Sequence, residues 1–187
     1  MEDLEEGNKK RKKHMKTLKY IAVIFVILVI CLVIFSRIFQ NMHYRTEVSI
    51  NVPVQKVFTG YTDIGKMERW IPGFEKIEFL GGFMMGQGTR LKLVLNNNGK
   101  QTTAIQEIKQ MKWNKLIEYS ISERRITVST TVKFIPGENS TIVITENEVH
   151  GNGFLWKTFL PFIKPVISKE AHKSQEMFKA VMEKDFS

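Results

Sequence analysis

The chain contains three hydrophobic patterns in succession, of which the first is continuous, the second alternating and the third helical. Residues 20–36 carry no charge at all. Between Glu47 and His150, apolar and polar residues repeatedly alternate with a period of two, which is typical of half-buried strands. Towards the C-terminus, apolar residues recur at steps of three and four. The sequence therefore predicts an apolar helix, a β-rich region and a final amphipathic helix.

The first apolar segment has the length of a membrane span. Extended to Leu18 and Phe39, it would form a helix roughly 33 Å long, close to the hydrocarbon thickness of a bilayer. We interpret residues 20–39 as a transmembrane anchor. The alternative is a cleaved signal peptide, but the apolar part of such a peptide is usually shorter and is followed by small residues at cleavage spacing. Cys31, the single cysteine, excludes an intramolecular disulfide and a cysteine-rich zinc site.

Charge on either side of this segment predicts its orientation. Residues 1–19 form a tail rich in Lys and Arg. Between the uncharged residues 20–36 and Glu47, by contrast, the only Lys or Arg residues are Arg37 and Arg45. Because positive charge is retained on the cytoplasmic side, we expect a single-pass cell-membrane protein with a cytoplasmic N-terminus and an extracytoplasmic C-terminal domain. Beyond Arg37 the basic residues are scattered rather than gathered in a stripe, so no nucleic-acid partner is expected.

Seven strands and two short helices are predicted after the anchor. Pro53 opens the first helix, which ends before Gly65, and the second covers Lys66 to Trp70. The turns Asn96–Gly99 and Pro136–Asn139 are short, which favours an antiparallel meander. The predicted strands are residues 47–51, 74–80, 89–95, 102–112, 115–121, 126–135 and 141–150.

The C-terminal region is expected to be a long helix that covers the sheet. Because Pro161 and Pro165 would each remove a backbone hydrogen bond, we expect the regular helix to begin near Pro165, with residues 154–162 as a bent or separate lead-in. The apolar stripe of this helix is Ile163, Ile167, Ala171, Ser174, Phe178 and Val181, widened by Val166, Met177 and Met182.

This order of elements resembles the START-like (SRPBCC) superfamily and, within it, the polyketide cyclase/dehydrase-type domains. The opening VSINVPVQKVFTGYTDIGKMERWIPG and the closing helix SQEMFKAVMEKDF carry the resemblance, which covers residues 45–187. It implies an α+β helix-grip fold, with a seven-stranded curved antiparallel sheet around a long C-terminal helix, here preceded by one transmembrane helix. It also implies an apolar cavity between sheet and helix that commonly holds a hydrophobic ligand. The superfamily has no common catalytic motif, so no catalytic residue is assigned.

Candidate chemistry in the sequence is sparse. The four histidines lack metal-ligand spacing and no glycine motif completes a nucleotide fingerprint, so neither a metal nor a cofactor is expected. A strand glutamate that faced the cavity could act as an acid or base, although strand glutamates usually lie on the solvent face. The strand glutamates in question are Glu107, Glu118, Glu146 and Glu148.

Six residues are candidates for contact with a ligand. Phe83, Met84 and Met85 lie among four glycines and would form either a flap at the cavity mouth or a hairpin whose aromatic ring folds back on the core. Arg90 and Tyr119 could orient a polar group of the ligand. Phe178 lies on the helix stripe that would cover the cavity.

The function expected from these features is membrane-anchored binding of a hydrophobic small molecule or lipid, without chemistry. Two alternatives remain open. One is a cyclase or dehydratase-type enzyme that uses a buried Glu or Tyr. The other is a protein-interaction module whose cavity is filled by its own side chains.

Overall fold

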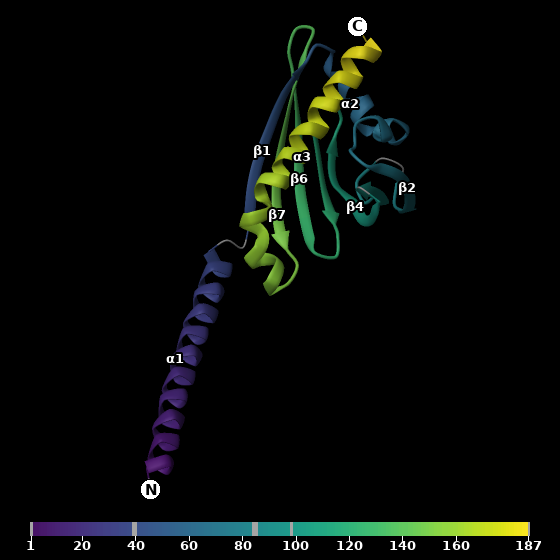
Figure 1. Cartoon of the computed structure of the whole chain (residues 1–187). Coiled ribbons are helices and arrows are strands. Elements are labelled where there is room, and N and C mark those ends of the chain that lie inside the picture. The colour runs from purple at the N-terminus through teal and green to yellow at the C-terminus, as the bar shows by residue number, and fades with distance from the viewer. Residues whose placement is uncertain (1, 39–40, 84–85, 98, 187) are drawn as a thin grey trace. The chain divides into compact units, whose positions relative to one another are not determined.

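The structure is a computed structural model that describes residues 2–38, 41–83, 86–97 and 99–186. The chain divides into two compact units, Met1–Phe39 and Gln40–Ser187. Figure 1 shows the first as a single helix and the second as a sheet covered by helices. We describe each unit by itself.

The first unit is helix α1 (Glu2–Ile38). Its segment Met15–Ile34 is long and apolar enough to cross a membrane, judged by length and composition, and none of it is buried within the protein. The predicted anchor, residues 20–39, falls within α1 except for Phe39, which lies outside the described residues.

The second unit is built on a seven-stranded antiparallel sheet in the order β1-β7-β6-β5-β4-β3-β2. The predicted fold class is confirmed. All neighbours in this order except β1 and β7 are consecutive in the chain, as a meander requires. The strands are β1 (Asn41–Ile50), β2 (Phe74–Gly81), β3 (Arg90–Asn97), β4 (Lys100–Lys112), β5 (Leu116–Ser122), β6 (Ile126–Pro136) and β7 (Thr141–Gly151).

The first strand is longer than predicted. β1 begins at Asn41, whereas the sequence predicted a strand from Glu47, because it pairs with β7 over its whole length, from Asn41 opposite His150 to Ile50 opposite Thr141. The added segment also alternates, with Met42 and Thr46 buried on the inward face.

The helices cover one face of this sheet. α2 (Val54–Thr62), the 3₁₀ helix η1 (Ile64–Arg69) and α3 (Phe154–Phe186) contribute to the inward side, and Figure 1 shows α3 lying along the sheet. Phe58 of α2, Phe178 of α3 and Val132 of β6 are fully buried in one apolar cluster. Burial of this face supplies the main driving force for folding of the unit.

The prediction that the regular helix begins near Pro165 is wrong. α3 is one helix of 33 residues with Pro161 and Pro165 inside it. Each proline costs the helix one backbone hydrogen bond, but packing of the same turns against β1 and β7 offsets the loss. The residues of α3 in that contact are Leu160, Ile163 and Ile167.

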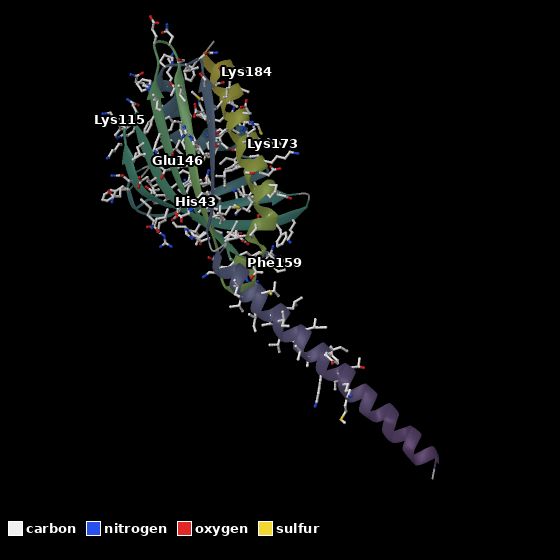
Figure 2. The ribbon with its side chains drawn as sticks, turned by 90° about the vertical axis from the view of Figure 1, so that its left-hand side faces the viewer. His43, Lys115, Glu146, Phe159, Lys173 and Lys184 are labelled. Atoms are coloured by element: carbon white, nitrogen blue, oxygen red, sulfur yellow. The ribbon has the colours of Figure 1, made fainter. Side chains whose placement is uncertain are left out.

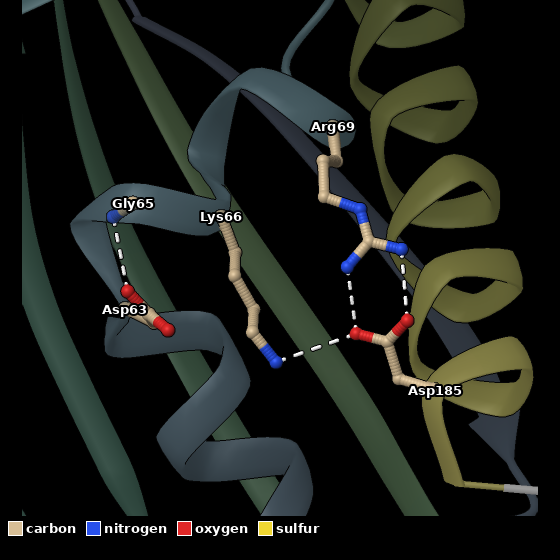
Figure 3. A network of polar contacts seen from close by, with 5 residues as sticks. All are labelled: Asp63, Gly65, Lys66, Arg69 and Asp185. Atoms are coloured by element: carbon tan, nitrogen blue, oxygen red, sulfur yellow. Dashed lines mark hydrogen bonds and ion pairs between the residues drawn. The ribbon is translucent and has the colours of Figure 1, made fainter.

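An ion-pair network fixes the C-terminal end of α3 to η1 (Figure 3). Both carboxylate oxygens of Asp185 accept from the Arg69 guanidinium, at 2.6 and 2.8 Å, and Lys66 Nζ lies 3.3 Å from one of them. The Arg69 hydrogen bonds, followed by the Lys66 ammonium, lower the pKa of Asp185 from 3.8 to about 2. η1 itself is capped by Asp63, whose side chain accepts from the Gly65 amide at 3.0 Å.

We predict that Asp185→Asn destabilises the domain in a pH-dependent way. Because the folded-state pKa is depressed, the stabilisation is complete above the ordinary value of 3.8 and is lost as the pH falls towards about 2. Thermal unfolding at neutral pH should show a lower melting temperature for the variant, with the difference narrowing under acid. Glu138→Gln, in an exposed turn, is the control. A difference that is constant with pH would contradict the assignment.

We also predict that Gly151→Ala loosens the start of α3. A Cβ at Gly151 would lie 2.5 Å from the Lys157 amide nitrogen and 2.6 Å from the Trp156 carbonyl carbon. Both are backbone atoms, which cannot rotate away as the end of a side chain can. Overpacking of this kind typically costs about 1–3 kcal/mol of unfolding free energy, measurable by urea denaturation. Gly86→Ala, where the nearest atom is an ordinary contact at 3.6 Å, should change stability little. Equal effects of the two variants would contradict the proposed clash.

Candidate ligand-binding site

A cavity of about 210 Å³ lies between the inward face of the sheet and the middle of α3. It is the position at which a helix-grip fold would hold a ligand. The strands contribute alternate residues, and α3 contributes residues from one side of two successive turns. The lining residues are Tyr44, Thr46, Tyr61, Trp70, Tyr119, Ile121, Val128, Thr130, Val143, Thr145, Asn147, Ala171, Ser174, Gln175 and Phe178.

Unpaired polar atoms distinguish this cavity from a packed core. Within the described part of the chain, four buried side-chain polar atoms have no hydrogen-bond partner, and all four belong to lining residues. Such an atom typically costs about 1–3 kcal/mol when it is left without a partner. The four atoms are Thr46 Oγ1, Trp70 Nε1, Asn147 Nδ2 and Gln175 Oε1.

Two of these side chains, the amides of Asn147 and Gln175, are held in place by hydrogen bonds to their other ends. Thr130 Oγ1 donates to Asn147 Oδ1 at 2.8 Å, and Gln175 Nε2 donates to Thr145 Oγ1 at 2.5 Å. Each amide group therefore has one fixed end and one unpaired end. The residues of the cavity wall thus carry unpaired amide and indole N–H donors, an amide oxygen acceptor and a hydroxyl.

Three tyrosines complete the polar part of the wall. The hydroxyls of Tyr61 and Tyr119 lie 2.9 Å apart. Burial, followed by the neighbouring Tyr119, raises the pKa of Tyr61 well above its usual value and the pKa of Tyr44 to about 12. Burial also raises the pKa of Tyr119, against the opposing hydrogen bonds of Tyr61 and Thr130. All three hydroxyls are therefore protonated at neutral pH, and one of the Tyr61–Tyr119 pair donates to the other.

No lining residue is charged. Glu107, Glu118, Glu146 and Glu148 alternate with inward residues and so belong to the opposite face of the sheet. There Glu107 pairs with Lys109 at 2.6 Å and Glu146 with Lys133 at 2.7 Å, and these hydrogen bonds lower the pKa of both carboxyls. None of the four strand glutamates lines the cavity.

The six candidate ligand residues are not all brought together. Tyr119 and Phe178 line the cavity from β5 and α3. Phe83 is 80% exposed after β2 and Arg90 is exposed in β3, and neither is among the lining residues. Met84 and Met85 lie outside the described residues. The Phe83 carbonyl accepts a hydrogen bond from the buried hydroxyl of Thr89, the residue before β3.

Sequence reasoning missed most of the polar wall, although a signal for it exists. In β7, Thr145 and Asn147 alternate in step with Val143 and Val149, so all four side chains lie on the inward face of the sheet. In α3, Gln175 lies on the stripe of Phe178. Polar residues at apolar positions of an amphipathic pattern mark either a polar layer or a site, and here they line the cavity.

A larger depression of about 560 Å³ lies on the opposite face of the sheet, over β1, β6 and β7. It is open and lined mainly by polar and charged residues, including His43, Arg45 and Glu146; Figure 2 shows His43 and Glu146 on this face. Because charged side chains there already pair with one another, the interior cavity is the stronger candidate. The described residues contain no group of three or more His, Cys, Asp or Glu that could hold a metal ion.

Solved structures with this fold are numerous, and the three described below are distant from this chain in sequence. Ara h 8.0201 is 23% identical, with a TM-score of 0.62 over 76% of this chain and 95% of that one. The Zhui aromatase/cyclase from Streptomyces sp. R1128 is 15% identical, with a TM-score of 0.64 over 76% and 94%. Truncated norcoclaurine synthase from Thalictrum flavum is 17% identical, with a TM-score of 0.57 over 75% and 92%. No curated protein matches.

The comparison with protein families is more specific. The model of polyketide cyclase / dehydrase and lipid transport proteins matches residues 42–183, from the start of β1 almost to the end of α3, and so includes every residue that lines the cavity. The resemblance to the START-like superfamily is thereby confirmed. The chain belongs to the polyketide cyclase/dehydrase and lipid transport family.

Proposed function

We propose that this protein is a membrane-anchored binding protein whose cavity takes an uncharged molecule of one or two rings that carries hydrogen-bonding groups. The observation that carries the proposal is the convergence of all four unpaired buried polar atoms of the described residues on one cavity. A ligand that satisfied them would recover the cost of their burial. Family membership supports a ligand-binding role for the domain.

Size supports a small ligand. A dry cavity of roughly 150 Å³ holds benzene, so a cavity of about 210 Å³ has room for a somewhat larger molecule. A sterol or a whole phospholipid exceeds this volume with α3 in its present position. Charge supports a neutral ligand, because a carboxylate or an amine would enter an uncharged, partly apolar wall without a counter-ion.

Membrane anchoring is supported by α1. Its apolar segment is long enough to span a bilayer, and the basic residues that precede it favour a cytoplasmic N-terminus. The domain with the cavity would then lie on the outer side of the membrane.

A second candidate function is cyclase or dehydratase chemistry, supported by the Tyr61–Tyr119 hydroxyl pair at 2.9 Å. Protonated phenols can polarise a carbonyl group of a substrate. They do not withdraw a proton near neutral pH when their pKa values are raised. In a reaction the pair would therefore polarise the substrate and leave the role of base to another group, and no lining residue of the cavity is charged.

We predict that the protein binds 1-naphthol more tightly than naphthalene. Both probes are uncharged two-ring molecules, but only naphthol can pair with the polar wall. Trp70 lines the cavity, so its fluorescence reports occupancy. Thr46→Val removes one unpaired hydroxyl, and should raise the stability of the free protein by about 1 kcal/mol while it weakens naphthol binding up to about tenfold. Thr130→Val is the matched control, because it removes a hydroxyl that is already paired and should lower stability.

Three outcomes of this experiment would contradict the proposed ligand class. Equal affinities for naphthol and naphthalene would show that the polar atoms play no part. Binding of a fluorescent fatty acid with no binding of naphthol would favour a lipid ligand. Retention of naphthol binding in Ala171→Phe, which fills the cavity from α3, would place the ligand elsewhere.

We predict that protease added to intact cells digests the domain and leaves an N-terminal tag protected. The basic residues before the apolar segment are the physical reason, because they resist transfer across the membrane. Tags at both ends, followed by immunoblotting, provide the measurement, and permeabilised cells are the control. A protected domain would contradict the orientation. Release of the domain into the medium would contradict the anchor and favour a cleaved signal peptide.

A further inference from the structure

The first half of α3 has apolar residues on its outer side as well as its inner side. Leu155, Phe159, Phe162 and Val166 recur at steps of four, three and four and therefore share one face of the helix. They are 66, 52, 69 and 63% exposed, so the prediction that Val166 widens the stripe covering the sheet is wrong. The inner side of the same turns is already used for packing, with Leu160 fully buried against Met42 and Val149. A helix face turned to water is normally polar, so we call these four residues the outer stripe and ask what covers it.

Basic residues surround the outer stripe. Arg124 and Arg125 are exposed in the turn between β5 and β6, and the Arg125 guanidinium lies over the Trp156 ring at 5.0 Å. The backbone joins this turn to the start of α3, because the Asn152 amide donates to the Arg125 carbonyl at 2.8 Å. Lys169, three residues after Val166, is exposed on the same side of α3. Apolar side chains flanked by Arg, Lys and Trp are typical of segments that lie in the interface of an anionic bilayer.

The outer stripe belongs to the end of the domain at which β1 begins. Leu160, which lies between Phe159 and Phe162 in the sequence, packs on Met42, the second residue of β1. Figure 2 shows Phe159 beyond the His43 end of the sheet, with Lys115 towards the other end. Only Phe39 and Gln40 separate β1 from the last residue of α1, and the Cα atoms of Ile38 and Asn41 can therefore be at most about 11 Å apart. If α1 spans the bilayer, this end of the domain stays at the membrane surface.

We propose that the outer stripe lies in the interface of an anionic phospholipid bilayer. The inference rests on the membrane anchor of the proposed function and adds to it a second contact with lipid, made by the domain itself. Leu155, Phe159, Phe162 and Val166 lie among the upper acyl chains, and Arg124 and Lys169 contact phosphate groups. Interfacial helices of this kind bury their apolar face about 5–10 Å into the headgroup and acyl boundary.

This position would bring the cavity close to lipid. Tyr44 and Val128 line the cavity and also pack against the Met42–Leu160 cluster on which the first half of α3 lies. The same turns of α3 thus separate the cavity from the outer stripe. A hydrophobic ligand dissolved in the bilayer would reach the cavity past these turns without crossing bulk water.

The test uses the full chain in vesicles of phosphatidylcholine and phosphatidylglycerol. With Cys31 replaced by Ala, a single cysteine at Leu155 carries an environment-sensitive fluorophore, and lipids bear spin labels either near the headgroup or deep in the acyl chains. We expect the Leu155→Cys label to lose most of its fluorescence to the shallow spin label and less to the deep one. Replacing phosphatidylglycerol with phosphatidylcholine should reduce the loss, because the basic residues then lack partners.

Two further labels control the result. Trp113, between β4 and β5, is 67% exposed and so matches Leu155, and a label at Trp113→Cys should not be quenched by either lipid. A label at Ile24→Cys, in α1, should be quenched by the deep spin label. Quenching at Ile24 without quenching at Leu155 would overturn this inference and leave the anchor standing, whereas no quenching at Ile24 would overturn both. A blue-shifted Leu155 label that lipid does not quench would show that a protein covers the stripe, and would also overturn the inference.

Discussion

The contact of Phe178 with two aromatic rings is the interaction on which the closed form of the domain depends. Its ring centroid lies 5.3 Å from that of Tyr61 in α2 and 5.2 Å from that of Trp70 after η1. It therefore joins three elements that cover the same face of the sheet. A buried phenylalanine in such a position typically contributes about 3–5 kcal/mol relative to alanine. The position of α3 over the strands, and with it the existence of an enclosed site, follows from this contact.

The site exists because the core is interrupted. One apolar cluster gathers around Phe178, and a second around Leu160, nearly two turns from the start of α3. Between them the inward positions of β1, β7 and α3 carry polar residues, Thr46, Asn147 and Gln175, each of which has one buried polar atom without a hydrogen-bond partner. If these positions carried apolar residues, their side chains would pack together and fill the cavity. The domain instead keeps a polar layer between two apolar ones, at a cost in stability that a bound molecule would offset.

The alternation of residues in the sequence predicted the sheet well and the site poorly. Ile126 to Phe134 alternates so regularly that both the strand and its buried face follow from it, and Phe178 was correctly placed on the covering stripe. The extra length of β1 depends on its partner β7, and the continuity of α3 through two prolines depends on tertiary packing, which local patterns do not contain. The unpaired atoms of Trp70 and Gln175 depend on which neighbours each side chain meets, so they emerge only from the assembled structure.

The two ends of α3 are held by different interactions, so the free energy of local opening differs along the helix. At its C-terminal end, Asp185 is held by Arg69 and Lys66, and Glu183 accepts from the Asn51 amide at 3.0 Å. At its N-terminal end, Pro161 and Pro165 leave two turns short of backbone hydrogen bonds. The free energy of local opening is therefore lowest at the end that is poorest in backbone bonds. Transient fraying of that end would admit a molecule to the polar layer while the aromatic contacts of Phe178 keep the rest of the domain folded, so ligand exchange need not involve global unfolding.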